Sequence, residues 1–257
     1  EGSKPVQGQL SSVALMDARS IAATAKNGGV LTAATEIDYN VPDMPYEYDG
    51  EIYKKRCYYG FGKADPSAQL KLGPNIADWP KMYPLQENLL VKLAAVIDDP
   101  VTTTDELIPS GETSSYRSNP VKLSEFALSR RAPEYVGRSK AARDMADAVR
   151  NGEIPGELAA VMEKLGLPAD TLKETTVGSG VFANRPGDGS AREQAASCQK
   201  VLGGVANIAY SYATKRYRSN CINWGILPFT LDENTPFHYE PGDFLYVPGI
   251  REAVKNG

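Results

Sequence analysis

The sequence predicts an α/β domain in the second half of the chain. Stretches typical of strands alternate there with stretches typical of helices, and glycines or Asn-Gly pairs close several of the helices. The chain has 257 residues, of which 42% are hydrophobic, so it is long enough to bury a core. These observations indicate a globular protein that mixes helices and strands.

The first part of the chain predicts one helix and then a long connection. Apolar residues recur at helical spacing over residues 11–27, and Gly28 and Gly29 end the helix. Residues 39–84 are rich in Pro, Gly, Asp and aromatic side chains, which predicts a surface connection that its aromatics pin to a core. The apolar run 89–97 predicts a buried element that leads into a turn or strand.

The second part predicts helices that cover a sheet. Asn151-Gly152 and Gly166 close two of the helices, Gly225 closes a later one, and the first strand ends in a turn over residues 184–187. The predicted helices are 139–150, 156–165, 194–204 and 213–224, and the predicted strands are 175–183, 205–209 and 226–230.

Residues 189–193, with the sequence GSARE, are the first candidate site. They place the Ser190 hydroxyl and the Arg192 guanidinium at the predicted start of a helix, where backbone N–H groups are unpaired and the helix dipole is positive. Such a position stabilises an anionic substrate or a serine alkoxide. Ser190 and Glu193 also fit a capping box, in which they only close the helix end, and these residues alone favour that alternative.

Composition excludes several classes of function. The net charge of −4 and the pI near 5.3 argue against nucleic acid and anionic membranes as partners. The sequence has neither a run of ~20 apolar residues nor a signal peptide, so we expect a cytoplasmic protein. The three cysteines fit no disulfide framework and are interpreted as free thiols, while the single histidine, His238, argues against a multi-histidine zinc site or a Ser-His-Asp triad.

Several motifs in register indicate a family. The chain resembles the C-terminal part of the aconitase family of iron–sulfur hydro-lyases. The resemblance rests on Thr103-Thr104-Asp105 followed by Gly111 and Arg117, on residues 189–193, and on Arg216, Asn220 and Gly225-Ile226-Leu227-Pro228.

The resemblance implies how the chain is organised. Residues 98–257 correspond to the family's mobile swivel domain, a β/β/α sandwich, and residues 39–97 to an interdomain linker. Residues 1–38 correspond to the helical tail of the preceding iron–sulfur domain. Because the sequence starts at Glu1 rather than at a methionine, we expect a fragment or a processed product.

The resemblance also implies roles for individual residues. Ser190 is the expected general base, and Arg117 and Arg192 are expected to bind substrate carboxylates. Asp105 is expected to organise the site, and Ala191 lies at a further substrate-contact position, where the family commonly has a second serine. The family's 4Fe-4S cluster would be bound by residues outside this chain, so we expect no metal here and no activity from the chain alone.

Departures from the family pattern leave the substrate open. Ala191, Glu106 and Ile108 stand where the family has serine, histidine or other polar residues, so the substrate is expected only to be a small di- or tricarboxylic hydroxy acid. One alternative is a free-standing small subunit, as in isopropylmalate isomerase, which pairs with a cluster-bearing chain. Another is an RNA-binding module that uses the basic residues Lys215, Arg216 and Arg218, although the acidic balance counts against it.

Overall fold

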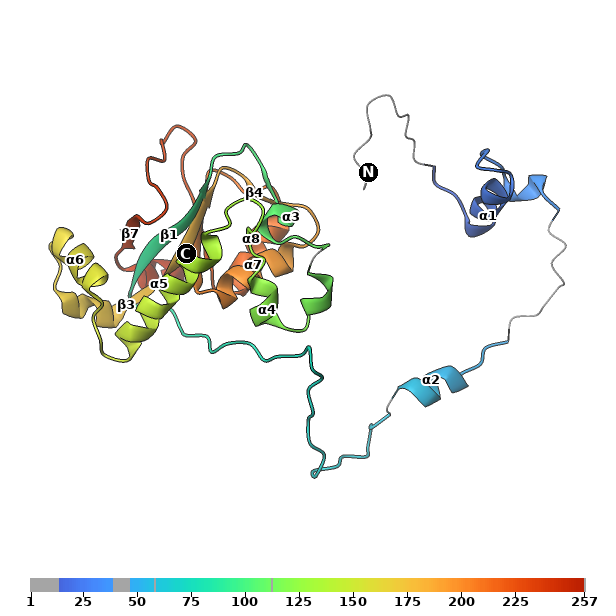
Figure 1. The fold of residues 1–257 in the computed structure, drawn as a ribbon, viewed down its shortest axis with the longest axis horizontal. Helices are drawn as coiled ribbons and strands as arrows, with labels where there is room; N and C mark the ends of the chain where they lie inside the picture. Colours follow the sequence, from blue (N-terminus) through green and yellow to red (C-terminus); the bar gives the residue numbers. More distant parts are fainter. Residues whose placement is uncertain (1–13, 39–46, 58, 112, 257) are drawn as a thin grey trace. The chain divides into compact units, whose positions relative to one another are not determined.

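The computed structural model describes residues 14–38, 47–57, 59–111 and 113–256 (Figure 1). The chain divides into two compact units, Glu1–Ala68 and Gln69–Gly257.

The first unit contains α1 (Ala18–Lys26), the 3₁₀-helix η1 (Ala34–Glu36) and α2 (Glu51–Arg56). Helix α1 begins later than residue 11 because Asp17 caps it, accepting hydrogen bonds from the backbone N–H groups of Arg19 and Ser20. Residues 11–13 of the predicted helix lie outside the described residues, as do residues 39–46 of the predicted connection.

The second unit is built on a five-stranded sheet with the order β6-β5-β3-β1-β7. Strands β1 (Asn88–Ile97), β3 (Thr175–Ala183), β5 (Gly204–Ala209) and β6 (Leu227–Thr230) are parallel. The edge strand β7 (Phe244–Val247) pairs antiparallel with β1. The two central strands are almost entirely buried, as is usual for parallel strands covered on both faces. The α/β class predicted from the sequence is confirmed.

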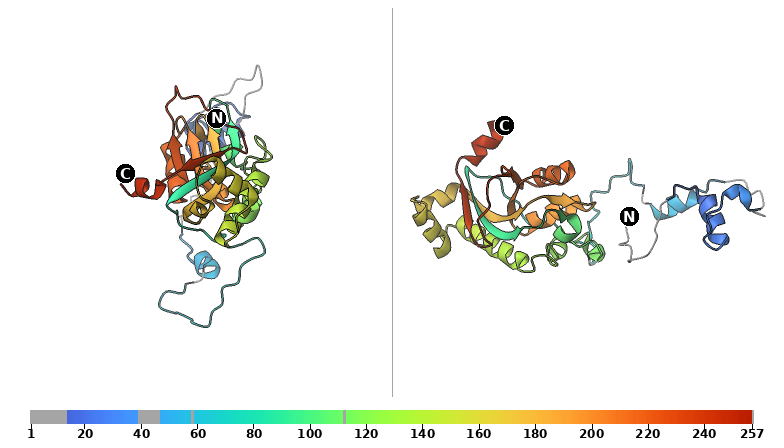
Figure 2. Two further views of the ribbon diagram at one scale, coloured as in Figure 1. Left: turned by 90° about the vertical axis from the view of Figure 1, so that its left-hand side faces the viewer. Right: turned by 90° about the horizontal axis from the view of Figure 1, so that it is seen from above.

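Alternating side chains of the strands face two different layers. On β3, Val177 and Val181 pack toward the face covered by α5 (Tyr135–Arg150), α6 (Gly156–Lys164), α7 (Arg192–Val201) and α8 (Lys215–Asn223). Phe182 points to the opposite face, where its ring stacks on Phe237 with centroids 3.8 Å apart. Ile250, the first residue of α9 (Ile250–Asn256), packs on that second face. The rest of the helix is exposed and projects from the domain at the C-terminal end (Figure 2).

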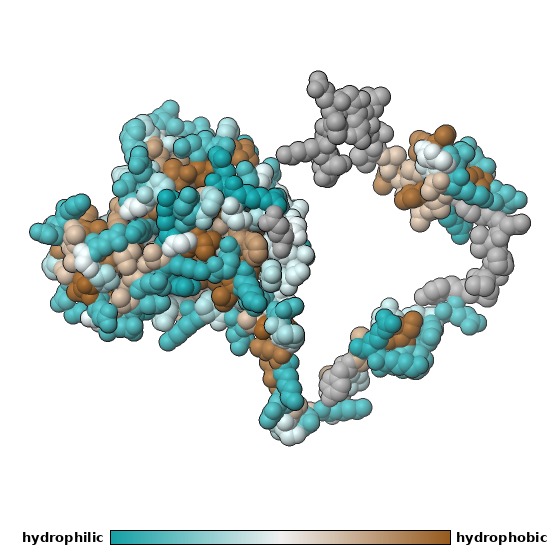
Figure 3. Space-filling model, viewed as in Figure 1, coloured by the Kyte–Doolittle hydropathy of each residue, from teal (hydrophilic) through white to brown (hydrophobic). Residues whose placement is uncertain are grey.

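Short elements connect this sheet to the helices. They are β2 (Thr102–Thr103), α3 (Thr104–Leu107), η2 (Ser114–Tyr116), α4 (Pro120–Ser124), η3 (Ala169–Glu174) and β4 (Pro186–Asp188). Hydrophilic side chains are interspersed with apolar ones on the face that Figure 3 shows, which is the mixed surface typical of globular proteins. None of the helices in the described part of the chain is long and apolar enough to cross a membrane.

Two segments differ from the sequence-based assignment. The range 39–97, assigned to a linker, includes β1, which lies between β3 and β7 in the sheet. The predicted turn at residues 184–187 is partly the strand β4, because Pro186–Asp188 finds a parallel partner in β2. Tertiary pairing therefore extends the sheet structure beyond what local sequence preference indicates.

Candidate functional site

The short pairing of β2 with β4 brings two of the sequence motifs together. Thr102 pairs with Pro186 and Thr103 with Asp188, so the Thr-Thr-Asp segment runs beside the segment that leads into Ser190. Gly189 fits closely against this neighbour: its φ is +132°, and a Cβ atom there would lie 2.1 Å from the Thr104 hydroxyl oxygen. Both the backbone angle and the close approach require glycine at this position.

Helix α7 starts directly after Ser190 and has no side-chain cap. Its N-cap is Ala191, whose methyl group cannot accept a hydrogen bond, so the first-turn N–H groups have no acceptor from that side chain. Ser190 is exposed immediately before this helix end. The alternative of a capping box formed by Ser190 and Glu193 is wrong, because the Glu193 carboxylate instead accepts hydrogen bonds from Asn220 Nδ2 and Trp224 Nε1.

Arg192, the first residue of α7, is anchored on the start of α8. Its Nε donates to Thr214 Oγ1 at 3.2 Å, and Thr214 is the N-cap of α8, where it accepts from the backbone N–H of Tyr217. The Thr214 hydroxyl donates in turn to the Gly187 carbonyl at 3.0 Å. In the described part of the chain no carboxylate forms an ion pair with Arg192, so the ends of its guanidinium remain available to an anion.

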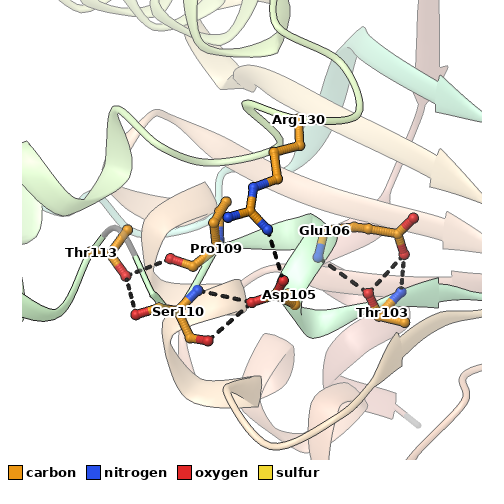
Figure 4. Close-up of polar contacts among 7 residues, drawn as sticks. All are labelled: Thr103, Asp105, Glu106, Pro109, Ser110, Thr113 and Arg130. Atoms are coloured by element: carbon orange, nitrogen blue, oxygen red, sulfur yellow. Dashed lines mark hydrogen bonds and ion pairs between the residues drawn. The ribbon is translucent and has the colours of Figure 1, made fainter. Parts of the chain in front are cut away.

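Asp105 holds the loop that follows α3, as Figure 4 shows. Its Oδ1 accepts from the backbone N–H and the hydroxyl of Ser110, both at 3.0 Å, and its Oδ2 lies 3.1 Å from Arg130 Nη1. The backbone hydrogen bond from Ser110 lowers the pKa of Asp105, with further contributions from the Ser110 hydroxyl and Arg130. Asp105 is therefore ionised and fixes the turn that leads toward Arg117.

Glu106, one of the departures from the family pattern, has a local structural role. Its Oε2 accepts from the Thr103 backbone N–H at 2.7 Å, while the Thr103 hydroxyl accepts from the Glu106 N–H at 3.2 Å (Figure 4). The two residues form a capping box at the start of α3. This closes the helix beside Gly189, so a glutamate supports the local fold at this position.

Arg117 follows η2 and precedes α4, which packs against α7. The loop before it is held by Thr113, whose hydroxyl donates to the Pro109 carbonyl at 2.6 Å (Figure 4). The Arg117 side chain is exposed and makes no hydrogen bond or ion pair with the rest of the described chain. The approach of its guanidinium to Ser190 and Arg192 stays a prediction.

The cysteines are placed as ordinary thiols. Cys198 and Cys221 are buried beside the sheet, and burial raises the pKa of Cys198 to about 12 and that of Cys221 to about 11. Cys57 is exposed in the first unit. Among the residues that the structure describes, no group of three His, Cys, Asp or Glu side chains could hold a metal ion. The described residues therefore do not fit an iron–sulfur cluster.

Three residues have roles in the structure that were not predicted from the sequence: Thr214, Glu193 and Arg130. Thr214 carried a usable signal, since a threonine just before a helix is a common N-cap. The contacts of Glu193 with α8 and of Arg130 with Asp105 join residues distant in the sequence, and local spacing does not indicate them. Lys215, Arg216 and Arg218, the basic residues of α8, are exposed.

Comparison with known proteins agrees with these motifs. Residues 173–234, which run from η3 through β6, match the family model described as the aconitase C-terminal domain. Over these residues the chain is similar to the aconitase C-terminal domain. Aconitate hydratase A of Rickettsia felis is 26% identical over 183 residues, which cover 64% of this chain and 21% of that protein. The Rickettsia bellii aconitate hydratase A is also 26% identical over 183 residues, covering 64% of this chain and 20% of its own.

The chain spans about a fifth of the length of the curated relatives it matches. Among solved structures, the 3-isopropylmalate dehydratase of Methanocaldococcus jannaschii is similar at 21% identity and a TM-score of 0.36, covering 66% of this chain and 78% of that one. The family match includes β4, Ser190, Arg192 and Thr214, the part of the site built around the start of α7.

Proposed function

We propose that this chain is the C-terminal, substrate-binding part of a hydro-lyase that dehydrates and rehydrates a small di- or tricarboxylic hydroxy acid. One observation carries the proposal. The exposed Ser190 lies between the start of α7, whose N-cap side chain makes no hydrogen bond, and Gly189, a position beside the Thr-Thr-Asp segment where only glycine fits. The same helix begins with an arginine that no carboxylate of the described chain neutralises. These are the groups needed to bind a carboxylate and remove a proton beside it.

Ser190 is proposed as the general base. A free serine hydroxyl is far too weak an acid to exist as an alkoxide at neutral pH, so its surroundings must stabilise the anion strongly. The positive end of the α7 dipole, its open first-turn N–H groups and the Arg192 guanidinium all act in that direction. The alkoxide would accept the proton on the carbon next to a substrate carboxylate.

Arg192 and Arg117 are proposed to bind the carboxylates of the substrate. Thr214 holds Arg192 by its Nε, which leaves the two terminal nitrogens for a bidentate contact. Arg117 is exposed, and in this proposal its guanidinium binds a second carboxylate of the same molecule. Ala191 is proposed to lie next to the substrate at the N-cap of α7. The hydrogen bond from Ser110 to Asp105 is proposed to fix the loop that carries Arg117.

The complete enzyme is proposed to need a cluster-bearing part. In this proposal residues 98–257 form the swivel domain together with β1, which lies in its sheet, the linker precedes β1, and residues 1–38 are the tail of the preceding domain. A 4Fe-4S cluster would supply a Lewis acid for the departing hydroxyl, held by residues outside this chain. We place the protein in the cytoplasm, where free thiols persist, and expect neither a membrane nor a nucleic-acid partner.

Hydratase assays of the full-length, cluster-loaded protein test this proposal. The ultraviolet absorbance of the unsaturated acid follows the reaction, with citrate, isocitrate and isopropylmalate as separate substrates. We expect turnover of at least one of these acids by the complete protein and none by this chain alone. Turnover that survives replacement of Ser190 by alanine, or an active and cluster-containing isolated chain, would contradict the assignment. If activity appears only after a separately encoded cluster-bearing chain is added, the small-subunit alternative is correct.

A further inference from the structure

The first turn of α7 is fastened to α8 at two points. Arg192 bonds to the N-cap of α8, and Glu193 bonds near its other end, where Asn220 Nδ2 lies 2.5 Å from the carboxylate and Trp224 Nε1 donates a second hydrogen bond. Because Glu193 is used in this way, it does not compete for the N–H groups at the start of its own helix. The orientation of α7 beside Ser190 therefore depends on α8.

Trp224 also contacts a segment that is distant in the sequence. Its ring packs against Trp79 with ring centroids 4.6 Å apart and an interplanar angle of 38°. Trp79 lies in the extended segment that precedes β1 within the second unit. Trp79 and Trp224 are the two tryptophans of the sequence, so the chain's whole tryptophan content is in this contact.

The same segment also contacts the loop that carries Arg117. The backbone N–H of Ala77 donates to the carbonyl of Ser118 at 3.0 Å. Ser118 directly follows Arg117, and Asn119 then caps α4 by accepting from the Lys122 N–H at 3.0 Å. One short stretch of chain, residues 77–79, thus contacts both Trp224 at the end of α8 and the loop that carries Arg117.

We propose that Glu193, Trp224 and Trp79 form a positioning relay that sets the separation between the two carboxylate-binding arginines, Arg117 and Arg192. The inference rests on the proposed function. Glu193 fixes the start of α7, Trp224 transmits that position to Trp79, and the Ala77–Ser118 bond transmits it to Arg117. A fixed distance between two guanidinium groups selects acids whose carboxylates are spaced to match it.

Tryptophan fluorescence of the 257-residue chain tests the relay, with citrate, glutarate and malonate as the titrants. In the wild type we expect citrate to change the emission, because both tryptophans belong to the relay, and we expect a clear preference between glutarate and malonate. Trp79→Ala should weaken citrate binding roughly tenfold and reduce the preference, measured by calorimetry, since the two arginines are no longer held together. Trp79→Phe keeps an aromatic ring at this position and should retain most of the citrate affinity and most of the preference between glutarate and malonate. Glu193→Gln should weaken binding as well, because one of its two acceptor oxygens becomes a donor.

Tyr83→Ala is the matched control. Tyr83 lies in the same extended segment, but its ring packs against Arg150, whose Cζ is 3.7 Å from the ring centroid. Removing the Tyr83 ring should therefore leave the citrate affinity and the preference between glutarate and malonate unchanged. Circular dichroism of each variant checks that the fold is retained. If the wild type binds citrate and folded Trp79→Ala binds it equally well with the same preference, the relay is overturned and the proposed function stands. If the wild type binds none of the three acids, the proposed function and the relay both fail.

Discussion

Arg192 donates its Nε hydrogen to the hydroxyl oxygen of Thr214 at 3.2 Å, which joins the first residue of α7 to the cap of α8. Thr214→Val removes this contact with little change in shape. We expect a loss of about 1 kcal/mol in the free energy of unfolding, since the α8 cap is lost, and a higher KM, since Arg192 is no longer held. Urea unfolding and steady-state kinetics of the full-length protein measure the two effects. Thr214→Ser keeps the hydroxyl and should behave as wild type; a matching loss in that variant would show that packing of the methyl group is responsible.

Ser190→Ala separates a catalytic serine from a helix cap. The hydroxyl caps nothing in the structure, so the free energy of unfolding should stay within about 0.5 kcal/mol of wild type. In the full-length enzyme, kcat should fall by about 10²–10⁴ because the general base is lost, while KM changes little. Thermal unfolding and kinetics are measured on the same preparation. A stability loss of about 1 kcal/mol with normal kcat would instead identify Ser190 as a structural cap.

Arg117→Lys should act on binding alone. The guanidinium has no partner among the described residues, so its replacement should leave stability unchanged. A lysine keeps the charge but cannot pair with a carboxylate in bidentate fashion, and KM should rise by an amount equivalent to about 2–3 kcal/mol. Arg185→Lys, at another exposed arginine just before β4, is the control and should leave KM as it is. Equal effects of the two substitutions would remove Arg117 from the site.

The contribution of Asp105 to the free energy of unfolding should decrease as the pH is lowered. The folded-state pKa of Asp105 is lowered, so its ionised form contributes stability above the unfolded pKa of about 3.9, and that contribution is lost as the pH falls through the folded value. Asp105→Asn should therefore cost stability near neutral pH, by less than about 1 kcal/mol because the carboxylate is exposed, and should cost nothing in strong acid. Urea midpoints from about pH 7 to about pH 3 measure the difference. A loss of the same size at every pH would show that the asparagine side chain itself, and not the missing charge, destabilises the turn.

The sequence predicts the regular elements of the second unit well. Strand β3 has the predicted bounds, and α5 to α8 contain most of the predicted helical ranges, because apolar periodicity and closing glycines act locally. The short strand β7 has no such pattern and forms because β1 offers it an open edge. The buried strand β1 was assigned to a linker, although its apolar run was recognised as a buried element.

In the candidate site, too, some residues can be predicted from the sequence and others cannot. The motifs around Asp105, Ser190 and Arg192 are visible in the sequence, and the pairing of β2 with β4 brings the first two into one region. The partners that hold them depend on tertiary contacts: Thr214 for Arg192, Arg130 for Asp105 and Trp224 for Glu193. A local pattern such as S-x-x-E cannot show that its glutamate has a stronger pair of donors on a neighbouring helix.

Ala191→Ser places at the N-cap of α7 the serine that the resemblance leads us to expect there. A serine hydroxyl there can accept from the N–H of Gln194, which should raise the free energy of unfolding by up to about 1 kcal/mol. The gain depends on a backbone adjustment, since ψ of Ala191 is 43° whereas capping residues are usually extended. The same bond withdraws one N–H group from an incoming carboxylate, so KM should rise while stability increases. Ala191→Gly adds no hydroxyl and is the control for backbone effects. If the serine variant instead shows a lower KM with no gain in stability, the added hydroxyl contacts the substrate, and the first-turn N–H groups are not the anion site.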